Sequence, residues 1–273
     1  MPSTRPHRPS PRPRADALAA VRLTLAQIDS DADAARNLRR IGAAVERAAA
    51  AGSTLVVFPE YAMYEKHAVD ATFAEVAEPV DGEFCSALSA LASSHRVAIV
   101  AGIVEQHPDG DRPFNTLVVI GRDGRLLGRH RKIHLYDAYG FHESAWISPA
   151  EHPEPTVVEV DGVRVGLMTC SDVRHSELGV ALAKAGAEIV ALCASWVPGE
   201  HKLDQWRVLA RARAIEHLYF VAAVSQAAPI SIGSSLVVDP MGEVIASLDE
   251  EPALLTLDVD ITEVAARRAA AAR

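Results

Sequence analysis

Three side chains that lie far apart in the sequence, Glu60, Lys132 and Cys170, together offer the chemistry needed to attack a carbon–nitrogen bond. A thiol that attacks an amide or nitrile carbon needs a base to accept its proton. The reaction also needs a cation or N–H donors near the oxygen that becomes negative. A carboxylate, an ammonium group and a thiol can fill these three roles. No serine, histidine and aspartate in this sequence form an arrangement as economical.

Each of these side chains follows a segment with the pattern of a buried strand. Glu60 comes after the apolar run 54–58, Lys132 after a short strand, and Cys170 after the run 163–169. Polar residues just past the carboxyl ends of buried strands are typical of active sites in layered α/β proteins. Taken singly, a surface carboxylate, a solvated lysine and a core cysteine would be ordinary, so the prediction depends on their joint occurrence.

The segment around Cys170 also predicts the state of its thiol. Small and polar residues follow the cysteine, and then a segment with the pattern of a helix, so the thiol is expected near a helix N-terminus. Backbone N–H groups at such a terminus favour negative charge. We therefore expect a thiol pKa below the ~8.5 of a free cysteine, and the same amides could hold an oxyanion.

The elements that must position these residues alternate between hairpins and strand–helix units. The spacing of apolar residues predicts helices over about 33–50, 84–93, 177–185 and 203–216. Strands are expected over 21–28, 54–58, 97–103, 115–120, 126–130, 156–160, 163–169, 189–192, 219–224, 235–238 and 243–246. Tight hairpin turns are predicted at 123–124, 161–162 and 239–242. This mixture predicts mixed sheets with helices packed outside them, in one layered α/β domain.

The composition bounds the kind of protein. The 273 residues, of which 49% are hydrophobic, are enough for a large core. Three cysteines without paired spacing argue against a disulfide framework and favour a reducing compartment, for which we expect the cytoplasm. The sequence contains no CxxC or HExxH motif and therefore predicts no metal site. No apolar run approaches the ~20 residues that a membrane span needs.

We expect residues 1–19 to form a disordered tail, 20–262 a single domain, and 263–273 a tail or short helix. The tail has no acidic residue up to position 14 and no apolar region suited to a signal peptide; its basic residues are Arg5, Arg8, Arg12 and Arg14. Without these four charges, the formal charge of −9 becomes −13 for the rest. Such an acidic body argues against nucleic acid as a partner, and we expect neither nucleic acid nor a membrane.

Several blocks of the chain resemble the nitrilase superfamily of carbon–nitrogen hydrolases, over nearly everything from about residue 21 to 260. The blocks are Val57-Phe58-Pro59-Glu60-Tyr61, Asn115-Thr116, Gly128-Arg129-His130-Arg131-Lys132-Ile133-His134-Leu135, Cys170-Ser171-Asp172-Val173-Arg174 with Glu177-Leu178, Arg213-Ala214-Ile215-Glu216, and Gly233-Ser234-Ser235 with Asp239-Pro240-Met241-Gly242. One block alone would be a weak match, but the ordered set is highly specific.

This resemblance implies a four-layer α-β-β-α sandwich that pairs into homodimers or higher homo-oligomers through one helical face. It implies Glu60 as general base, Lys132 as oxyanion stabiliser and Cys170 as nucleophile. Glu143 matches a second glutamate that positions the substrate or the attacking water, and the Ser171 N–H would be the other oxyanion donor. No metal or organic cofactor is implied, and the expected partner is a small-molecule amide substrate.

The implied function is a cysteine-dependent amidase that hydrolyses a small aliphatic amide or an ω-amide through a thioester. Amidase-type members often carry Tyr-Asp-Leu-Arg-Phe-Pro-Glu after the cysteine, where this chain has Ser171-Asp172-Val173-Arg174-His175-Ser176-Glu177. This departure leaves the substrate open. N-carbamoyl hydrolysis is an alternative because Arg174 or His175 could bind a carboxylate, although Arg174 could equally form a structural salt bridge. Nitrile hydrolysis is a weaker alternative because true nitrilases usually carry Trp-Glu after the cysteine and a longer C-terminal extension.

Other residues and other classes of function also need weighing. Aromatic candidates for the rim of the pocket are Tyr61, Tyr64, Tyr136, Tyr139 and Trp196, of which Trp196 is the strongest because it follows a buried strand. Cys85 and Cys193 are assigned to the core. A catalytically inactive binding protein is an alternative from another class, which the complete Glu60, Lys132 and Cys170 set argues against. A redox sensor would require a resolving cysteine near Cys170.

Overall fold

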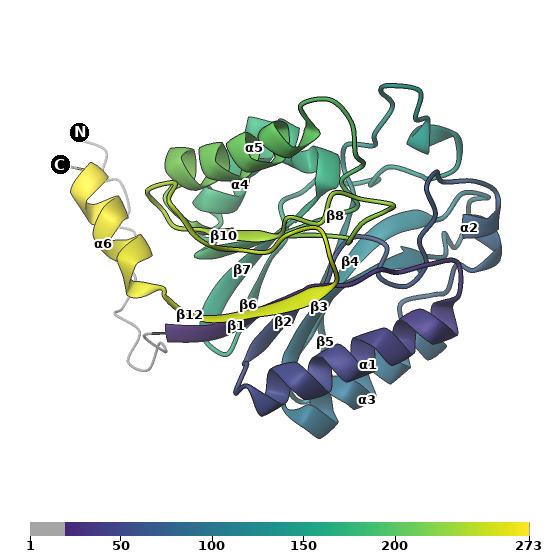
Figure 1. The fold of residues 1–273 in the computed structure, drawn as a ribbon, viewed down its shortest axis with the longest axis horizontal. Helices are drawn as coiled ribbons and strands as arrows, with labels where there is room; N and C mark the ends of the chain where they lie inside the picture. The colour runs from purple at the N-terminus through teal and green to yellow at the C-terminus, as the bar shows by residue number, and fades with distance from the viewer. Residues whose placement is uncertain (1–19, 273) are drawn as a thin grey trace, which may run out of the picture.

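Two six-stranded sheets packed face to face form the centre of the computed structural model, which describes residues 20–272 (Figure 1). The first sheet has the order β12(Ala253–Asp260), β1(Ala20–Gln27), β2(Leu55–Val57), β3(Ala98–Glu105), β4(Phe114–Ile120), β5(Leu126–Arg131). The second has the order β11(Val244–Ser247), β10(Leu236–Val238), β9(Phe220–Ser225), β8(Ile189–Ala194), β7(Val163–Thr169), β6(Val157–Val160). The tail expected over residues 1–19 lies outside the described residues.

Helices cover the outer face of each sheet, which completes four layers. Figure 1 shows α1(Ala34–Ala50) and α3(Glu83–His95) on the first sheet, and α4(Ser176–Lys184) and α5(Lys202–His217) on the second. One apolar cluster lies between the sheets, and one lies under each helical layer. Burial of apolar surface in three clusters stabilises such a stack. The α-β-β-α sandwich implied by the resemblance is confirmed.

The local sequence signals for these elements hold in the structure. In α1, the apolar residues at helical spacing are buried, and the Asp33 side chain accepts a hydrogen bond from the Arg36 N–H as a helix cap, at 2.9 Å. The turn between β6 and β7 places Asp161 and Gly162 at positive φ, the conformation that an Asp-Gly hairpin turn uses. Hairpins β4–β5 and β10–β11 form as predicted.

Among residues 20–272, β12 and α2(Thr72–Glu75) were not predicted from the sequence patterns, and the C-terminal helix was predicted only as one of two alternatives. Strand β12 pairs antiparallel with β1 over eight residues, and α2 is a single helical turn. The C-terminal segment, expected as a tail or short helix, forms α6(Thr262–Ala271), which lies beyond β12 at the side of the sandwich (Figure 1). Within residues 20–272, no helix is long and apolar enough to cross a membrane.

The parallel strands at the middle of each sheet determine where the functional residues gather. Strands β1, β2 and β3 run parallel in the first sheet, and β7, β8 and β9 run parallel in the second. The carboxyl ends of parallel strands meet at one edge of a sheet. Glu60 follows β2 and Cys170 follows β7, so both lie at such an edge.

Candidate active site

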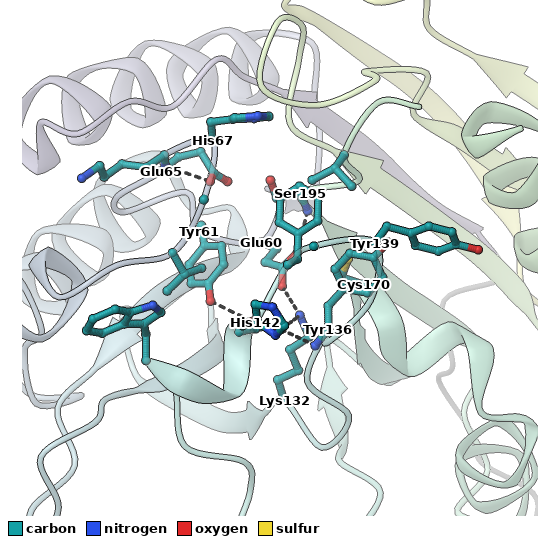
Figure 2. Close-up of a pocket in the computed structure, with 18 residues that line it drawn as sticks. Glu60, Tyr61, Glu65, His67, Lys132, Tyr136, Tyr139, His142, Cys170 and Ser195 are labelled. Atoms are coloured by element: carbon teal, nitrogen blue, oxygen red, sulfur yellow. Dashed lines mark hydrogen bonds and ion pairs between the residues drawn. The ribbon is translucent and has the colours of Figure 1, made fainter. Parts of the chain in front are cut away.

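Glu60, Lys132 and Cys170 line one cavity of about 510 Å³ (Figure 2). The three side chains follow different strands, β2, β5 and β7, of both sheets, yet Figure 2 shows them around a common centre. All three are at least nine-tenths buried. A buried cavity strengthens electrostatic interactions because water no longer screens them. The structure thus brings together the residues on which the sequence hypothesis depends.

The Lys132 ammonium lies between two buried carboxylates. Its Nζ donates to Glu60 Oε1 at 2.8 Å and to Glu143 Oε2 at 2.7 Å. Glu143 lies in the 3₁₀ turn η1(Glu143–Ala145), in the long connection after β5. Burial alone would lower the pKa of Lys132, but the carboxylates of Glu143 and Glu60 outweigh it and hold that pKa well above the usual range. Lys132 is therefore a permanent cation at the site.

Further donors hold the two carboxylates in place. Asn115 Nδ2 donates to Glu60 Oε1 at 2.7 Å and to Glu143 Oε1 at 3.1 Å. The Tyr61 hydroxyl also donates to Glu143 Oε1, at 2.9 Å. The backbone N–H groups of Tyr136 and Ser195 donate to Glu143 Oε2 and Glu60 Oε2 at 2.7 and 2.6 Å, respectively. With all four carboxylate oxygens bound, neither side chain is free to rotate, which fixes the site before a substrate arrives.

The backbone around Glu60 is fixed by a close approach to β3. A Cβ atom on Gly102 would lie 2.5 Å from the Tyr61 nitrogen and 2.8 Å from the Glu60 Cα, so only glycine fits there. The Gln226 side chain, which follows β9, donates to the Glu60 carbonyl at 3.0 Å. The general-base candidate is thus held by both sheets.

The Cys170 backbone adopts the left-handed conformation, with φ of 46°. A non-glycine residue in this region is uncommon, and such conformations concentrate at functional sites. The residue opens the 3₁₀ turn η2(Cys170–Arg174) directly after β7. This abrupt change from strand to turn directs the thiol into the cavity (Figure 2).

A buried carboxylate holds that turn from behind. Asp172 accepts from the Thr169 N–H at 3.1 Å and from the His134 N–H at 2.9 Å, and its oxygens contact the rings of His130 and His134 at 3.0 and 2.8 Å. Burial would raise the pKa of Asp172, but the hydrogen bonds from His130 and His134 prevail and hold that pKa well below its usual range. Asp172 therefore stays ionised and positions the segment that carries Cys170.

The expected lowering of the Cys170 pKa is wrong for the ligand-free site. Burial raises this pKa well above its usual range, and the Glu60 carboxylate raises it further, while Lys132 opposes the shift. The turn that follows is one short 3₁₀ helix whose amides do not outweigh these effects. Cys170 therefore rests as a neutral thiol beside a carboxylate that can accept its proton.

The remaining sequence candidates fall into two groups. Ser171 follows Cys170 in the buried turn, where the first N–H groups have no partner within the helix, and its hydroxyl donates to the His134 carbonyl. Tyr136 and Tyr139 line the cavity, and Tyr61 lines it as well. Tyr64 does not: its hydroxyl lies 2.9 Å from that of Thr72, and its ring packs on Phe73.

Arg174 and Trp196 lie together near Cys170. The Arg174 guanidinium stands 4.8 Å from the centre of the Trp196 ring, and its Nη2 donates to Gln205 Oε1 at 2.9 Å. Within residues 20–272, Arg174 forms no salt bridge with Asp172 or Glu177. His175, the other candidate anion ligand, stacks on His134 with the ring centres 3.5 Å apart. Cys85 and Cys193 are buried in the core as expected, and the thiols of all three described cysteines are free.

Sequence reasoning missed several residues of the site. Asn115 was noted only as part of a motif, although it bridges both carboxylates. Glu65 and Lys202, both at least nine-tenths buried beside the cavities, were not singled out. Burial raises the pKa of Glu65 well above its usual range, so its neutral form is favoured. No local signal marks Glu65 or Lys202, because both lie beside other polar residues in short connections or at a helix start.

Comparison with known proteins agrees with this geometry. The carbon-nitrogen hydrolase family model matches residues 22–269. A Mycobacterium tuberculosis protein named as a hydrolase is 42% identical over 264 residues, covering 91% of this chain and 92% of that protein. An omega-amidase of Xenopus tropicalis is 31% identical, covering 91% of each.

A solved structure shows the same likeness at the level of the fold. A mutant of an amidase from Nesterenkonia AN1, of the nitrilase superfamily, aligns with a TM-score of 0.79 and 26% identity over 93% of this chain and 96% of that one. The fold and the family match together define a class: the chain belongs to the carbon–nitrogen hydrolase family. The resemblance to the nitrilase superfamily is thereby confirmed.

Proposed function

We propose that the protein is a cysteine-dependent amidase that hydrolyses a small aliphatic amide or an ω-amide to a carboxylic acid and ammonia. The observation that carries the proposal is the burial of a thiol, an ammonium group and its two carboxylate partners around one cavity. The similar proteins named as amidases support the same class of substrate.

In the first half of the proposed reaction, Glu60 accepts the Cys170 proton as sulfur attacks the amide carbon. A tetrahedral intermediate forms, and Lys132 Nζ with the Ser171 N–H stabilises its oxyanion. The carbon–nitrogen bond then breaks, and the departing nitrogen takes the proton from Glu60 and leaves as ammonia. A neutral thiol beside a fixed carboxylate fits this order of steps because proton transfer and attack can occur together.

In the second half, water replaces ammonia and attacks the thioester carbon. Glu60 accepts a proton from this water, the carbon–sulfur bond breaks, and the proton returns to the sulfur. The Glu143 carboxylate, which Lys132, Asn115 and Tyr61 hold rigidly, positions the substrate or the water rather than accepting the proton. One carboxylate and one cation thus serve both halves.

A substrate panel tests the proposal. Purified protein is incubated with aliphatic amides, ω-amides, N-carbamoyl amino acids and nitriles, and ammonia release is measured for each. Amides are expected to give the highest kcat/KM, and acid quenching during turnover should trap an acyl group on Cys170. If N-carbamoyl compounds or nitriles release ammonia while amides do not react, the protein is an N-carbamoyl hydrolase or a nitrilase instead of an amidase. Binding of amides without any ammonia release would support an inactive binding protein.

We also propose that two copies associate through the α4–α5 layer. Large apolar side chains are exposed on this side, on both helices and on the neighbouring β10–β11 hairpin: Val180, Val208, Ile215, Met241 and Ile245. Burial of such a patch between copies is favourable. Light scattering after gel filtration should give the mass of a dimer or higher oligomer, and Val208→Asp should lower it. A monomeric wild-type protein would contradict this proposal.

A further inference from the structure

A second lysine lies beside the cavity in surroundings opposite to those of Lys132. Lys202 is the first residue of α5 and is only 7% exposed. Its Nζ donates to the Tyr136 hydroxyl and lies 4.7, 4.9 and 5.6 Å from the ring centres of Tyr136, Tyr139 and Trp196. The ammonium group is thus enclosed mainly by aromatic side chains.

No carboxylate compensates this charge. Within residues 20–272, no acidic side chain lies within salt-bridge distance of Lys202 or Arg174. The N-terminus of α5 adds partial positive charge at the same place. Burial lowers the pKa of Lys202, and the Arg174 guanidinium lowers it further. Three sources of positive charge therefore converge on one point.

Such an arrangement is unfavourable in the free protein. Buried charges are normally paired, and contact with aromatic faces compensates only part of the lost hydration. An anion bound at this point would satisfy the ammonium group, the helix terminus and Arg174 together. Strongly uncompensated charge beside a reaction centre is the pattern expected where a ligand supplies the missing partner.

The position of Lys202 connects it to the reacting thiol. Lys202, Arg174 and Cys170 line a second, smaller cavity of about 10 Å³, which has room for about one water-sized group. Its walls also include Tyr136, Ser195 and Val197, which line the main cavity too. A ligand attacked by Cys170 can therefore place one oxygen atom of an anionic group beside Lys202.

We propose that Lys202 binds a carboxylate on the acyl part of the substrate, so that the enzyme selects monoamides of dicarboxylic acids over neutral amides. This inference rests on the proposed amidase function and narrows it. Lys202 acts in binding and specificity, whereas Lys132 acts on the developing oxyanion. Arg174, at the exposed mouth of the site, adds to the attraction.

Two substrates of equal chain length test the inference: succinamate, which carries a carboxylate, and butyramide, which carries a methyl group in its place. Wild type should have the higher kcat/KM for succinamate. Lys202→Met should lower that value by about 10- to 100-fold, mainly through KM, because one charge-assisted hydrogen bond is lost. The kcat/KM of Lys202→Met for butyramide should stay within about threefold of the wild-type value, since the neutral chain of butyramide makes no such bond.

Two further lysine variants separate binding from structure. Lys202→Arg keeps the charge and should keep the preference for succinamate. Lys184→Met makes the same substitution as Lys202→Met at an exposed lysine and should leave kcat/KM for both substrates unchanged. Thermal melting shows whether each variant is folded. Should Lys202→Met not fold, Lys202→Gln must show the selective loss instead.

The inference is overturned if Lys202→Met lowers kcat/KM equally for both substrates, or if the wild-type protein has the higher kcat/KM for butyramide. Failure of the amidase proposal has a different signature. In that case wild type releases ammonia from neither amide, and Cys170 carries no acyl group after quenching.

Discussion

The two walls of the cavity treat buried charge in opposite ways. On the wall from the first sheet, Lys132 lies between Glu60 and Glu143, and Asn115 links the same two carboxylates. On the wall from the second sheet, Lys202 has aromatic rings and a tyrosine hydroxyl around it but no carboxylate among residues 20–272. A compensated wall keeps its geometry without a ligand, whereas an uncompensated wall gains stability when an anion binds.

This difference assigns separate tasks to two lysines of the same site. A catalytic group must hold its position before the substrate arrives, since preorganised charges stabilise a transition state without reorganising. A specificity group must instead interact more strongly with one substrate than with another. The same residue type can serve either task because its neighbours, not its own chemistry, decide which charges remain unpaired.

The largest expected effect comes from Lys132→Met. Turnover of neutral and anionic amides should fall by at least about 10³-fold alike, because the main oxyanion donor is removed. The free energy of unfolding should also fall by about 3–5 kcal/mol, since Glu60 and Glu143 are left buried without their cation. Steady-state kinetics and urea unfolding measure the two effects. A loss confined to anionic substrates would assign Lys132 to the task we give Lys202 and would remove the contrast between the walls.

Glu60→Gln should give the next largest effect, with kcat/KM reduced by about 10²–10⁴-fold through loss of the proposed general base. The same substitution should lower the pKa of Cys170, because the Glu60 charge is one cause of its elevation. The pH dependence of Cys170 alkylation measures this directly. A variant that alkylates at lower pH while turning over more slowly would separate thiol ionisation from catalysis. An unchanged alkylation profile would contradict the described electrostatics.

Asp172→Asn tests the buried carboxylate that lies behind the second wall and holds the turn of Cys170. Since the carboxylate accepts two backbone N–H groups and contacts two histidines, its loss should cost about 3–5 kcal/mol of stability. The pKa of Asp172 is lower in the folded protein, so its contribution is present above about pH 4 and is lost as the pH falls toward the folded value. The free energy of unfolding should change less between pH 7 and pH 3 for the variant than for wild type, as measured by denaturant titration at each pH. Equal differences would contradict an ionised Asp172.

The smallest effect is expected for Glu65→Gln, which tests a buried acidic group beside the cavity whose neutral form is favoured. Activity at pH 7 should stay within about threefold because glutamine resembles a protonated glutamate. Because the pKa of Glu65 is raised in the folded protein, the stability that Glu65 contributes is fully present below about pH 4.3 and is lost as the pH rises toward the folded pKa. The variant should lack this decline as the pH rises above about 4.3. A large loss of activity would show that Glu65 works as an ionised group.

The elements next to the three candidate catalytic residues could be predicted because their sequence signals are local. The apolar runs before Glu60 and Cys170 and the Asp-Gly turns depend on neighbouring residues alone. Strand β12 was missed although Leu255, Leu257 and Val259 alternate with polar residues. Its place beside β1, more than 200 positions away, depends on long-range pairing that local patterns do not show. Complementary chemistry linked Glu60, Lys132 and Cys170 in the sequence, and the resemblance to known blocks supported that grouping.

Other properties of the site depend on burial and could not be predicted from local patterns. A helix N-terminus near Cys170 was expected to lower its pKa, yet enclosure by both sheets and the nearby Glu60 carboxylate raise it. Lys202 looks like an ordinary first-turn residue of a helix until the structure places three aromatic rings around it. Long-range packing decides such environments, and a single sequence does not record it.

Turnover by a folded Cys170→Ala variant tests the central claim most directly. The variant should melt within a few degrees of wild type, since only one sulfur atom is removed from the site. Ammonia release from the best amide of the panel should fall by about 10⁵-fold or more, as expected when a covalent nucleophile is lost. Turnover at a rate near that of wild type would show that carbon–nitrogen cleavage does not pass through Cys170 and would contradict the account.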